Sequence, residues 1–493
     1  MTLTLTDLFC GAGGSSTGAV SIRGVAAKVA SNHWDRAIET HSRNHPNADH
    51  IQADISQIDP RYFPTTDLLW ASPSCTNHSI AQGRRRQDSQ PDLFGEILPD
   101  AAAERSRATM WDVVRFAEFH QYRGVIVENV VDVCKWAPFT AWEMAMQSIG
   151  YTGQFVFLNS MHAQLYGPGA PQTRDRWYAV FTRTGDRKPD VSRAVSPAAV
   201  CDECGPVQAR QVFKRIDRRP WGKYRAQYQY RCPNHQCRQR IVEPAFRPAF
   251  DIIDWSLHGT QIGARKRPLA AKTLARAQAG SDRYWEPLLL PVEGRGGKNA
   301  IPVSQPARTM TTRNETGLLV PTGGTWREDA VSTDQPMPTR TTRENDAIVF
   351  PPFIAELRGG SSDARPVTEP LATVTASGNH HALIAPYYGN GQVQRVLEPL
   401  TTVTTHERHA LVTPPAYQPM PPRRRIDINE AYFRMLEPRE ISAAMDFPTT
   451  YEMVGTRREQ VRLAGNAVTP PAARDLIGLV VEAITGESVS MAA

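Results

Sequence analysis

The chain has 493 residues, which is too long for one ordinary hydrophobic core and predicts about three domain-sized units. Its 41% hydrophobic and 22% charged residues are close to the globular average, and it has no apolar stretch long enough to span a bilayer, so a membrane protein and a wholly disordered chain are excluded. The net charge is only +6, but the basic residues are concentrated between positions 201 and 240.

The first 182 residues alternate short apolar runs with amphipathic stretches. This alternation predicts an α/β domain with a doubly wound, mostly parallel sheet, whose ligands bind beyond the carboxyl ends of the strands. We predict strands over 3–9, 25–30, 67–71, 124–127, 154–158 and 177–181, and helices that begin at Ser15 and Trp34 or span 107–121.

Several loops after these strands carry residues that suit ligand binding. The glycine-rich turn at 11–14 lets the backbone approach a ligand at a helix N-terminus, although such turns serve many nucleotides and some are only tight turns. Trp34 is a candidate for stacking on adenine or else a core aromatic residue. Asp54 could accept a hydrogen bond from an exocyclic amine or simply cap a helix.

Four residues are candidates for chemistry. Cys75 lies on the loop after the 67–71 run, where a cysteine can be a nucleophile, although single cysteines are more often inert. Glu128 directly follows a run that must be a buried strand, where a carboxylate is costly unless it is paired or functional. Arg174 and Arg176 lie on one side of an extended chain and could hold a carboxylate or a phosphate, or be surface ion-pair partners.

Seven cysteines are few and odd in number, which indicates reduced thiols rather than a disulfide scaffold. Four of them form the knuckles Cys201-x2-Cys204 and Cys232-x4-Cys237, a pattern that predicts a structural zinc site with four thiolates. His235 lies inside the second knuckle and could replace one cysteine.

The segment 201–240 contains ten Lys or Arg and three acidic residues, a local charge of +7, so the rest of the chain carries −1. This composition predicts a module with its own core that presents basic and aromatic side chains to phosphates and bases. The alternative is a zinc staple whose charges are merely solvated. The interleaved aromatic residues are Trp221, Tyr224, Tyr228 and Tyr230.

Prolines crowd the region that follows, with 18 of the 39 between 287 and 422, which favours short strands and turns. A Pro-x-x-Thr-x-Thr motif recurs four times about every 30 residues, and each copy, with the apolar run after it, predicts a β-hairpin. The copies could form a structural array or a set of DNA-facing loops. They begin at Pro306, Pro336, Pro370 and Pro399. From Phe433 the pattern is helical again, including 438–445 and 472–484.

Taken in order, five short motifs resemble those of the DNA (cytosine-5) methyltransferases, over about residues 3–182 and 433–484. The resemblance implies a Rossmann-like S-adenosylmethionine-dependent methyltransferase domain with a large, mostly β or irregular, inserted target-recognition region. The motifs are Phe9-x-Gly-x-Gly, Pro73-x-Cys75, Glu128-Asn129-Val130, Gln172-x-Arg174-x-Arg176 and Gly465-Asn466-Ala467-Val468.

We therefore expect three parts. Residues 1–182 would form the first part of the catalytic domain, and residues 426–493 would complete it. Residues 183–425 would form the target-recognition region, with the zinc module at 201–240 and the repeats at 304–415.

By the family mechanism, the Cys75 thiolate adds to carbon 6 of a cytosine flipped out of double-stranded DNA. Glu128, kept protonated by burial, would donate to ring N3 and accept from the N4 amine. Arg176, together with Arg174, would orient the Glu128 carboxyl group and contact the base O2.

The resemblance also assigns residues to S-adenosylmethionine. His33 stands where the family usually has an acidic residue on the ribose hydroxyls, although an imidazole can still hydrogen-bond a diol. Ser74 stands where a proline usually precedes the nucleophile. The expected cofactor-binding residues are Phe9, Gly11, Gly13, His33, Trp34, Asp54 and Asn466.

These expectations describe a DNA (cytosine-5-)-methyltransferase from a restriction–modification system, a stand-alone host enzyme or a phage. The first residues show no secretion signal, so we expect a cytoplasmic protein of a bacterial or phage-infected cell, without membrane partners. An RNA cytosine-5 methyltransferase and a catalytically inert DNA-binding relative are the alternatives. Retention of Cys75, Glu128 and both arginines speaks against the inert relative.

Overall fold

The computed structural model describes residues 2–73 and 101–254, most of 256–278, short stretches between 288 and 384, and 428–492 apart from Glu430. Packing divides the chain into two compact units, 1–321 with 426–493 and 322–425. The three-part division expected from the sequence stays a prediction.

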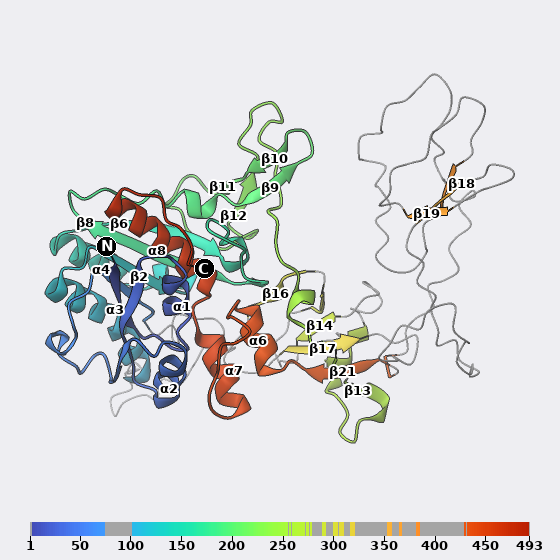
Figure 1. The fold of residues 1–493 in the computed structure, drawn as a ribbon, viewed down its shortest axis with the longest axis horizontal. Helices are drawn as coiled ribbons and strands as arrows, with labels where there is room; N and C mark the ends of the chain where they lie inside the picture. The colour runs from blue at the N-terminus through green and yellow to red at the C-terminus, as the bar shows by residue number, and fades with distance from the viewer. Residues whose placement is uncertain are drawn as a thin grey trace, which may run out of the picture. The chain divides into compact units, whose positions relative to one another are not determined.

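A seven-stranded sheet forms the centre of the first unit (Figure 1). Its order is β3-β2-β1-β4-β5-β8-β6, and the first five strands are mutually parallel, whereas β8 runs antiparallel to both β5 and β6. The predicted mostly parallel α/β sheet is therefore confirmed. The strands are β1 (Leu3–Leu8), β2 (Val25–Asn32), β3 (Asp49–Gln52), β4 (Leu68–Ala71), β5 (Gly124–Asn129), β6 (Tyr151–Asn159) and β8 (Asp175–Arg183).

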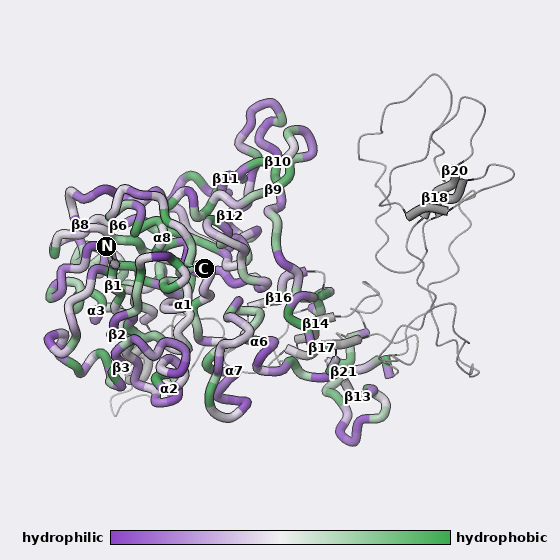
Figure 2. Tube along the Cα trace, in the orientation of Figure 1, coloured by the Kyte–Doolittle hydropathy of each residue, from purple (hydrophilic) through white to green (hydrophobic). Residues whose placement is uncertain are grey.

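Helices cover both faces of this sheet because the apolar residues of its strands point alternately to each side. In β5, Val125 and Val127 join the core formed with α3 (Ala101–His120) and α4 (Phe139–Ser148), whereas Ile126 joins the core formed with α1 (Gly14–Val20) and α8 (Pro470–Thr485). Figure 2 shows the contrast between the hydrophobic α8 and the largely hydrophilic α2 (Asp35–Asn44). A helix from the end of the chain thus completes the packing of a sheet formed by its beginning.

The direction of winding changes between β1 and β4, because β2 and β3 lie on one side of β1 and β4 and β5 on the other. Crevices of open α/β sheets form outside the carboxyl ends of strands at such a point. The glycine turn after β1 and the loop after β4 both begin there. In the part of the chain that the structure describes, no helix is long and apolar enough to span a bilayer.

The middle of the chain is built from short strands where it is described. Two hairpins, β9 with β10 and β11 with β12, precede a five-stranded sheet of order β13-β21-β17-β14-β15. Their bounds are β9 (Ala198–Cys201), β10 (Gly205–Gln208), β11 (Arg210–Phe213), β12 (Tyr228–Arg231), β13 (Thr260–Gln261), β14 (Leu288–Pro291), β15 (Ile301–Pro302), β17 (Thr316–Val320) and β21 (Tyr432–Met435). In the second unit, β18 (Phe353–Glu356) pairs with β19 (Ala364–Pro366) and β20 (His381–Ile384).

The first proline-threonine repeat does not form the expected hairpin. Its strand β16 (Ala307–Arg308) pairs in parallel with β7 (Gln172–Thr173), and β17 pairs with β14 and β21. Its strands therefore add to existing sheets instead of pairing with each other. Most of the other three copies lies outside the described residues.

The C-terminal part starts with β21 rather than with the helix expected from Phe433, and then turns helical as predicted. Its helices are α6 (Pro438–Ala444), α7 (Arg457–Asn466) and α8, and short 3₁₀ helices occur elsewhere in the chain. These span Pro60–Tyr62, Val131–Lys135, Ser160–His162, Arg193–Val195, Ala249–Ile252 and Ile262–Ala264.

A buried polar network lies beneath the first helix. The Ser15 and Ser16 hydroxyls donate to one carboxylate oxygen of Asp7 at 2.5 and 2.7 Å. His41 Nε2 lies 2.9 Å from Ser16 Oγ, and its Nδ1 lies 2.8 Å from His50 Nε2. Burial raises the pKa of Asp7 to about 6 and lowers the pKa of His41 well below its usual range. Burial therefore shifts the titration of both groups toward their neutral forms.

His45 gives this network a measurable pH dependence. Its Nε2 lies 3.1 Å from Thr17 Oγ1, and burial lowers its pKa from 6.5 to about 4. As the pH falls below 6.5, the unfolded chain takes up this proton first, so the stability due to His45 is lost between about pH 6.5 and pH 4. Asp7 acts in the opposite direction, because its raised pKa makes the folded state take up a proton first.

We therefore predict that the stability difference between the wild type and His45→Gln shrinks by about 1.5 kcal/mol from pH 6.5 to pH 5. Denaturant unfolding of both proteins at the two pH values measures this, and subtracting the variant removes the common contribution of Asp7. A pH-independent difference would contradict the assignment.

Candidate active site and cysteine cluster

The centre of the candidate site is an ion pair between neighbouring strands. Glu128 lies near the carboxyl end of β5, and Arg176 is the second residue of β8, which runs antiparallel beside it. Arg176 Nε lies 2.8 Å from Glu128 Oε1, and the two side chains are only 13% and 11% exposed. The predicted role of Arg176 in holding this carboxyl group agrees with the contact. The protonated state proposed for Glu128 stays a prediction.

Asn129 connects this pair to the loop that carries the candidate nucleophile. Its side chain is fully buried, and its Nδ2 donates to the Pro73 carbonyl oxygen at 3.3 Å. Its Oδ1 accepts from the Val130 N–H at 2.8 Å. The chain two residues before Cys75 is thereby held beside the carboxyl end of β5. Cys75 itself lies outside the described residues.

Arg174 contacts a different partner from Arg176. Its buried guanidinium donates to the carbonyl oxygens of Gly465, at 3.2 and 3.3 Å, and of Ala467, at 3.0 Å. These residues belong to the last of the five motifs, at the end of α7. The observed contacts of Arg174 therefore place the C-terminal motif, while Arg176 is the arginine that pairs with Glu128.

The glycine turn after β1 has a strained backbone. Phe9, Gly11 and Gly13 all have positive φ, at 59°, 53° and 84°, and Phe9 has a side chain that makes this conformation costly. A Cβ on Gly14 would lie 1.9 Å from the Val468 carbonyl oxygen, so this glycine is needed for close packing. At Gly11 the nearest atom would be 4.0 Å away, which leaves room on the side expected to face the cofactor.

The other four expected cofactor residues lie outside this turn and are mostly exposed to solvent. Trp34 is half-buried, and the Arg462 guanidinium lies 4.4 Å from the centre of its ring. His33, Asp54 and Asn466 are exposed. Asp54 accepts from the Ser56 N–H at 3.1 Å in a turn, so it does not cap a helix as the alternative had it. The cofactor roles of these residues stay predictions.

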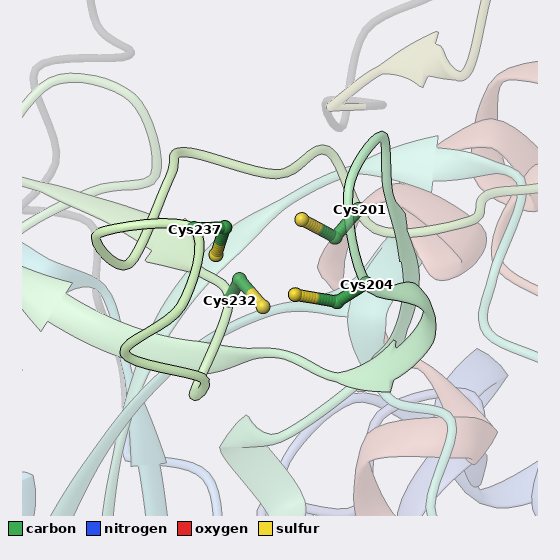
Figure 3. Close-up of side chains that lie close together, drawn as sticks. All are labelled: Cys201, Cys204, Cys232 and Cys237. Atoms are coloured by element: carbon green, nitrogen blue, oxygen red, sulfur yellow. The ribbon is translucent and has the colours of Figure 1, made fainter.

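The four knuckle cysteines converge from two loops (Figure 3). Cys201 and Cys204 come from the β9–β10 turn, and Cys232 and Cys237 follow β12. Their sulfur atoms all lie within 4.8 Å of one another, and three of the residues are buried. The sequence prediction that these four side chains form one cluster is confirmed. His235, the predicted replacement, is exposed and is not one of the four.

The prediction that this module has a core of its own is wrong. Cys201, Cys232 and Cys237 belong to the same buried cluster as the α3 and α4 face of the central sheet. Tyr228 and Tyr230 are fully buried, so they do not present their rings to nucleic acid. The physical reason is the period of two in Tyr228-Gln-Tyr-Arg231, which directs both tyrosines to one side of β12.

The basic residues of the module are also less available than expected. Five of the ten form ion pairs, and three of the acidic partners, Asp132, Glu143 and Glu243, lie outside residues 201–240. Arg219 makes a two-pronged contact with Glu143 of α4 at 2.8 Å. The other paired residues are Arg215, Lys223, Arg225 and Arg240. The local charge of +7 is therefore partly neutralised within the protein.

Three residues of the site were not singled out from the sequence. Asp175 lies between the two arginines and accepts from the Tyr224 N–H at 2.9 Å. Tyr451 donates to the Ala12 carbonyl oxygen in the glycine turn, and Arg462 covers Trp34. The position of Asp175 inside the arginine motif was a usable signal. Tyr451 and Arg462 are far from their partners in sequence, and nothing local to them indicates the contact.

Comparisons with known proteins agree with the family resemblance of these motifs. The family model of the C-5 cytosine-specific DNA methylases matches residues 3–217 and 303–482. The type II methyltransferase M.AgeI of Thalassovita gelatinovora is 25% identical over 192 residues, which cover 37% of this chain and 40% of that protein, so the chain matches less than half of this relative.

Solved structures with a similar chain trace include the Entamoeba histolytica methyltransferase EhMeth, with a TM-score of 0.47, 10% identity and coverage of 98% and 99% of the two chains. The S. pombe Dnmt2 methyltransferase has a TM-score of 0.47 and 12% identity, with coverage of 98% of this chain and 100% of the other. The assignment rests on the family match, which covers most of the chain and includes all five motifs. The chain belongs to the C-5 cytosine-specific DNA methylase family.

Proposed function

We propose that this protein transfers a methyl group from S-adenosylmethionine to carbon 5 of a cytosine flipped out of double-stranded DNA. The observation that carries the proposal is the Arg176–Glu128 pair, with Asn129 holding the Pro73 end of the Cys75 loop beside it. This arrangement gathers a carboxyl group, a cation and the approach to a thiol at the carboxyl edge of the sheet. These are the groups that cytosine methylation requires.

The chemistry begins with the thiolate of Cys75, because carbon 5 of cytosine is too weak a nucleophile to take a methyl group unaided. The thiolate forms a bond to carbon 6, and the electron pair of the ring double bond becomes available at carbon 5. Carbon 5 would then attack the methyl group that S-adenosylmethionine supplies, and the electron pair of the broken carbon–sulfur bond would stay with the cofactor. A base removes the carbon 5 proton, and elimination of the thiolate restores the double bond.

Glu128 and Arg176 would hold the base during this sequence. The Glu128 carboxyl group would donate to N3 and accept from the N4 amine, which selects cytosine and offsets the charge that develops on the ring. Arg176 would keep this carboxyl group in place through the 2.8 Å contact and approach O2. Arg174 would support the site indirectly, because it holds the C-terminal motif.

The residues present fit S-adenosylmethionine in two respects. Gly11 leaves open space at the end of β1, and the turn lies where the winding of the sheet changes direction. Phe9 and Trp34 would contact adenine, Asp54 its amine and His33 the ribose. The cofactor supplies an electrophilic methyl group on a sulfonium sulfur. Gly11 and Gly13 would lie near the methionine portion of the cofactor, and Asn466 at the back of the cofactor or nucleotide pocket.

The cysteine cluster has the composition of a structural zinc site, and we propose that it holds one zinc ion. Four thiolates leave no coordination position open for catalysis. Figure 3 shows the side chains pointing toward a common centre, which is what one tetrahedral ion requires.

We also propose a restriction–modification role for the protein, in which its methylation activity protects DNA.

Replacing the nucleophile tests the covalent step. Cys75→Ser should abolish turnover and leave DNA binding intact, because a hydroxyl is a far weaker nucleophile than a thiolate at neutral pH. DNA with 5-fluorocytosine at the target should trap the wild type, since fluorine replaces the proton that must leave. Bisulfite sequencing of DNA and RNA from expressing cells gives activity and substrate together.

Cys134→Ser is the matched control for this experiment, because burial raises the pKa of the Cys134 thiol to about 12 and makes it a poor nucleophile. It should methylate and be trapped like the wild type. Near-normal methylation by Cys75→Ser would rule out the covalent mechanism. Methylation of RNA with none of DNA would replace the proposed substrate.

Glu128→Gln tests the recognition of the base. The amide keeps the size of the side chain but cannot supply a proton to N3, so the single-turnover rate should fall by roughly 100-fold or more. Cofactor binding, followed by calorimetry, should be unchanged. Normal turnover in this variant would remove the proposed role of Glu128.

Metal analysis tests the zinc site. The purified protein should carry about one zinc per chain, and the double variant Cys201→Ser/Cys204→Ser should carry none. Because the cysteines share the core of the catalytic sheet, loss of the metal should lower the thermal midpoint of the whole domain rather than unfold the module alone. A native, metal-free wild type with normal stability would remove the zinc proposal.

A further inference from the structure

The segment between the two cysteine knuckles docks on the chain beside both catalytic side chains. At Arg176, the neighbouring Asp175 accepts a hydrogen bond from the Tyr224 N–H at 2.9 Å. Near Glu128, the Trp221 indole N–H donates to the Val131 carbonyl oxygen at 3.0 Å. The module therefore contacts β8 one residue from the arginine, and the chain just after β5 three residues from the carboxylate.

Further contacts hold the same surfaces together. Lys223 pairs with Asp132 at 3.3 Å, and Lys135 lies 4.5 Å from the centre of the Trp221 ring. The Gln211 side chain donates to the Phe157 carbonyl oxygen of β6 at 2.8 Å. The segment thus reaches the chain after β5, the start of β8 and the edge strand β6.

The cysteine cluster sets the position of this segment. β12 leads directly into Cys232, so a metal bound by the four sulfurs would fix the end of that strand. Two residues earlier on β12, Tyr230 packs edge-on against the buried His162, with ring centres 5.0 Å apart. Tyr224 contacts the same imidazole from 4.6 Å. A short, buried path therefore joins the cysteines to the Tyr224–Asp175 bond.

We propose that the metal-loaded cysteine module positions the Arg176–Glu128 pair, and that Asp175 and Trp221 are the positioning residues through which it acts. The inference rests on the proposed function in that the pair holds the target cytosine. It assigns the module a role in the rate of methyl transfer, which differs from the contact with DNA phosphates suggested by its charge.

The physical reason is that the positions of the two charged side chains depend on the position of the backbone that carries them. β5 ends and β8 begins at this edge of the sheet, and the ladder between them stops at the Asn129–Trp177 pair, so Arg176 is paired with β6 alone. Contacts from the module hold the chain just after β5 and the first residue of β8, next to the point where this ladder stops. Displacements of about 1 Å in a catalytic group can cost roughly 100-fold in rate.

The first experiment removes the metal from the full-length protein with a chelator. Hydrogen exchange should increase in peptides covering 124–132 and 172–178, and stay unchanged in the control peptide 3–20 around the glycine turn. The single-turnover methylation rate should fall roughly 10- to 100-fold, with the affinity for S-adenosylmethionine unchanged. Restoring zinc should restore both readouts.

The second experiment breaks the docking contacts with the metal in place. Trp221→Phe removes the indole N–H but keeps an aromatic ring, and should lower the single-turnover rate by about 2- to 10-fold with full zinc content. Asp175→Ala should have a larger effect on the rate, and Asp175→Asn should recover most of it, since its side-chain oxygen still accepts from Tyr224. Gln208→Ala, an exposed change on β10 of the same module, is the matched control and should behave like the wild type.

The two readouts separate this inference from the proposed function. Unchanged exchange at 124–132 and 172–178 after metal removal would overturn the positioning role, whatever the enzyme methylates. A normal rate in both Trp221→Phe and Asp175→Ala would overturn the assignment of those residues. A metal-loaded wild type that methylates no DNA would refute the proposed function, and the exchange experiment would still decide whether the module holds the pair.

Discussion

The buried guanidinium of Arg174 is the constraint on which the domain depends. A charge withdrawn from water is costly unless hydrogen-bond acceptors surround it, and Arg174 finds carbonyl oxygens of Gly465 and Ala467. These acceptors come from the far end of the sequence, so these hydrogen bonds form only when α7 has returned to the sheet. The neighbouring Val468 then packs against Gly14, which ties the same C-terminal segment to the glycine turn.

The edge of the sheet that carries the candidate site is assembled in the same way, by polar groups that bond to one another across long sequence distances. Glu128 avoids isolation in the core through Arg176, and Asn129 avoids it through Pro73. Burial raises the pKa of Asp175, and a hydrogen bond from the Tyr224 N–H opposes that shift. Each buried polar group is therefore also a link between two segments.

The sequence predicts the strands and helices of the first 182 residues well, because their apolar periods are strong and their loops contain glycine. It also predicts that the four knuckle cysteines form one cluster, because their spacing is typical of a zinc site and can be recognised without a structure. It fails at Tyr228 and Tyr230, which look like aromatic residues available for bases but alternate with polar residues along a buried strand. The basic and aromatic composition of this segment suggested exposed tyrosines, whereas the alternation along the strand indicated buried ones.

The two arginines show a second limit of the sequence. A spacing of two predicts one shared side for Arg174 and Arg176, but β8 begins only at Asp175, so the first arginine precedes the strand and turns to another partner. Which arginine contacts the Glu128 carboxylate therefore depends on the residue at which β8 begins. The role of Arg462 over Trp34 is equally inaccessible, because the two residues are brought together only by the return of the C-terminal helices.

The contribution of α8 to the sheet has a consequence for biosynthesis. One face of β1, β4 and β5 is covered by residues 470–485, which a ribosome makes long after the strands themselves. At typical elongation rates of 5 to 20 residues per second, roughly 15 to 60 seconds separate the completion of β8 from the appearance of α8. During that interval Leu3, Leu5 and Ile126 have no helix α8 to cover them. Chaperones that shield apolar surface on nascent chains would therefore have a defined period in which to act on this protein.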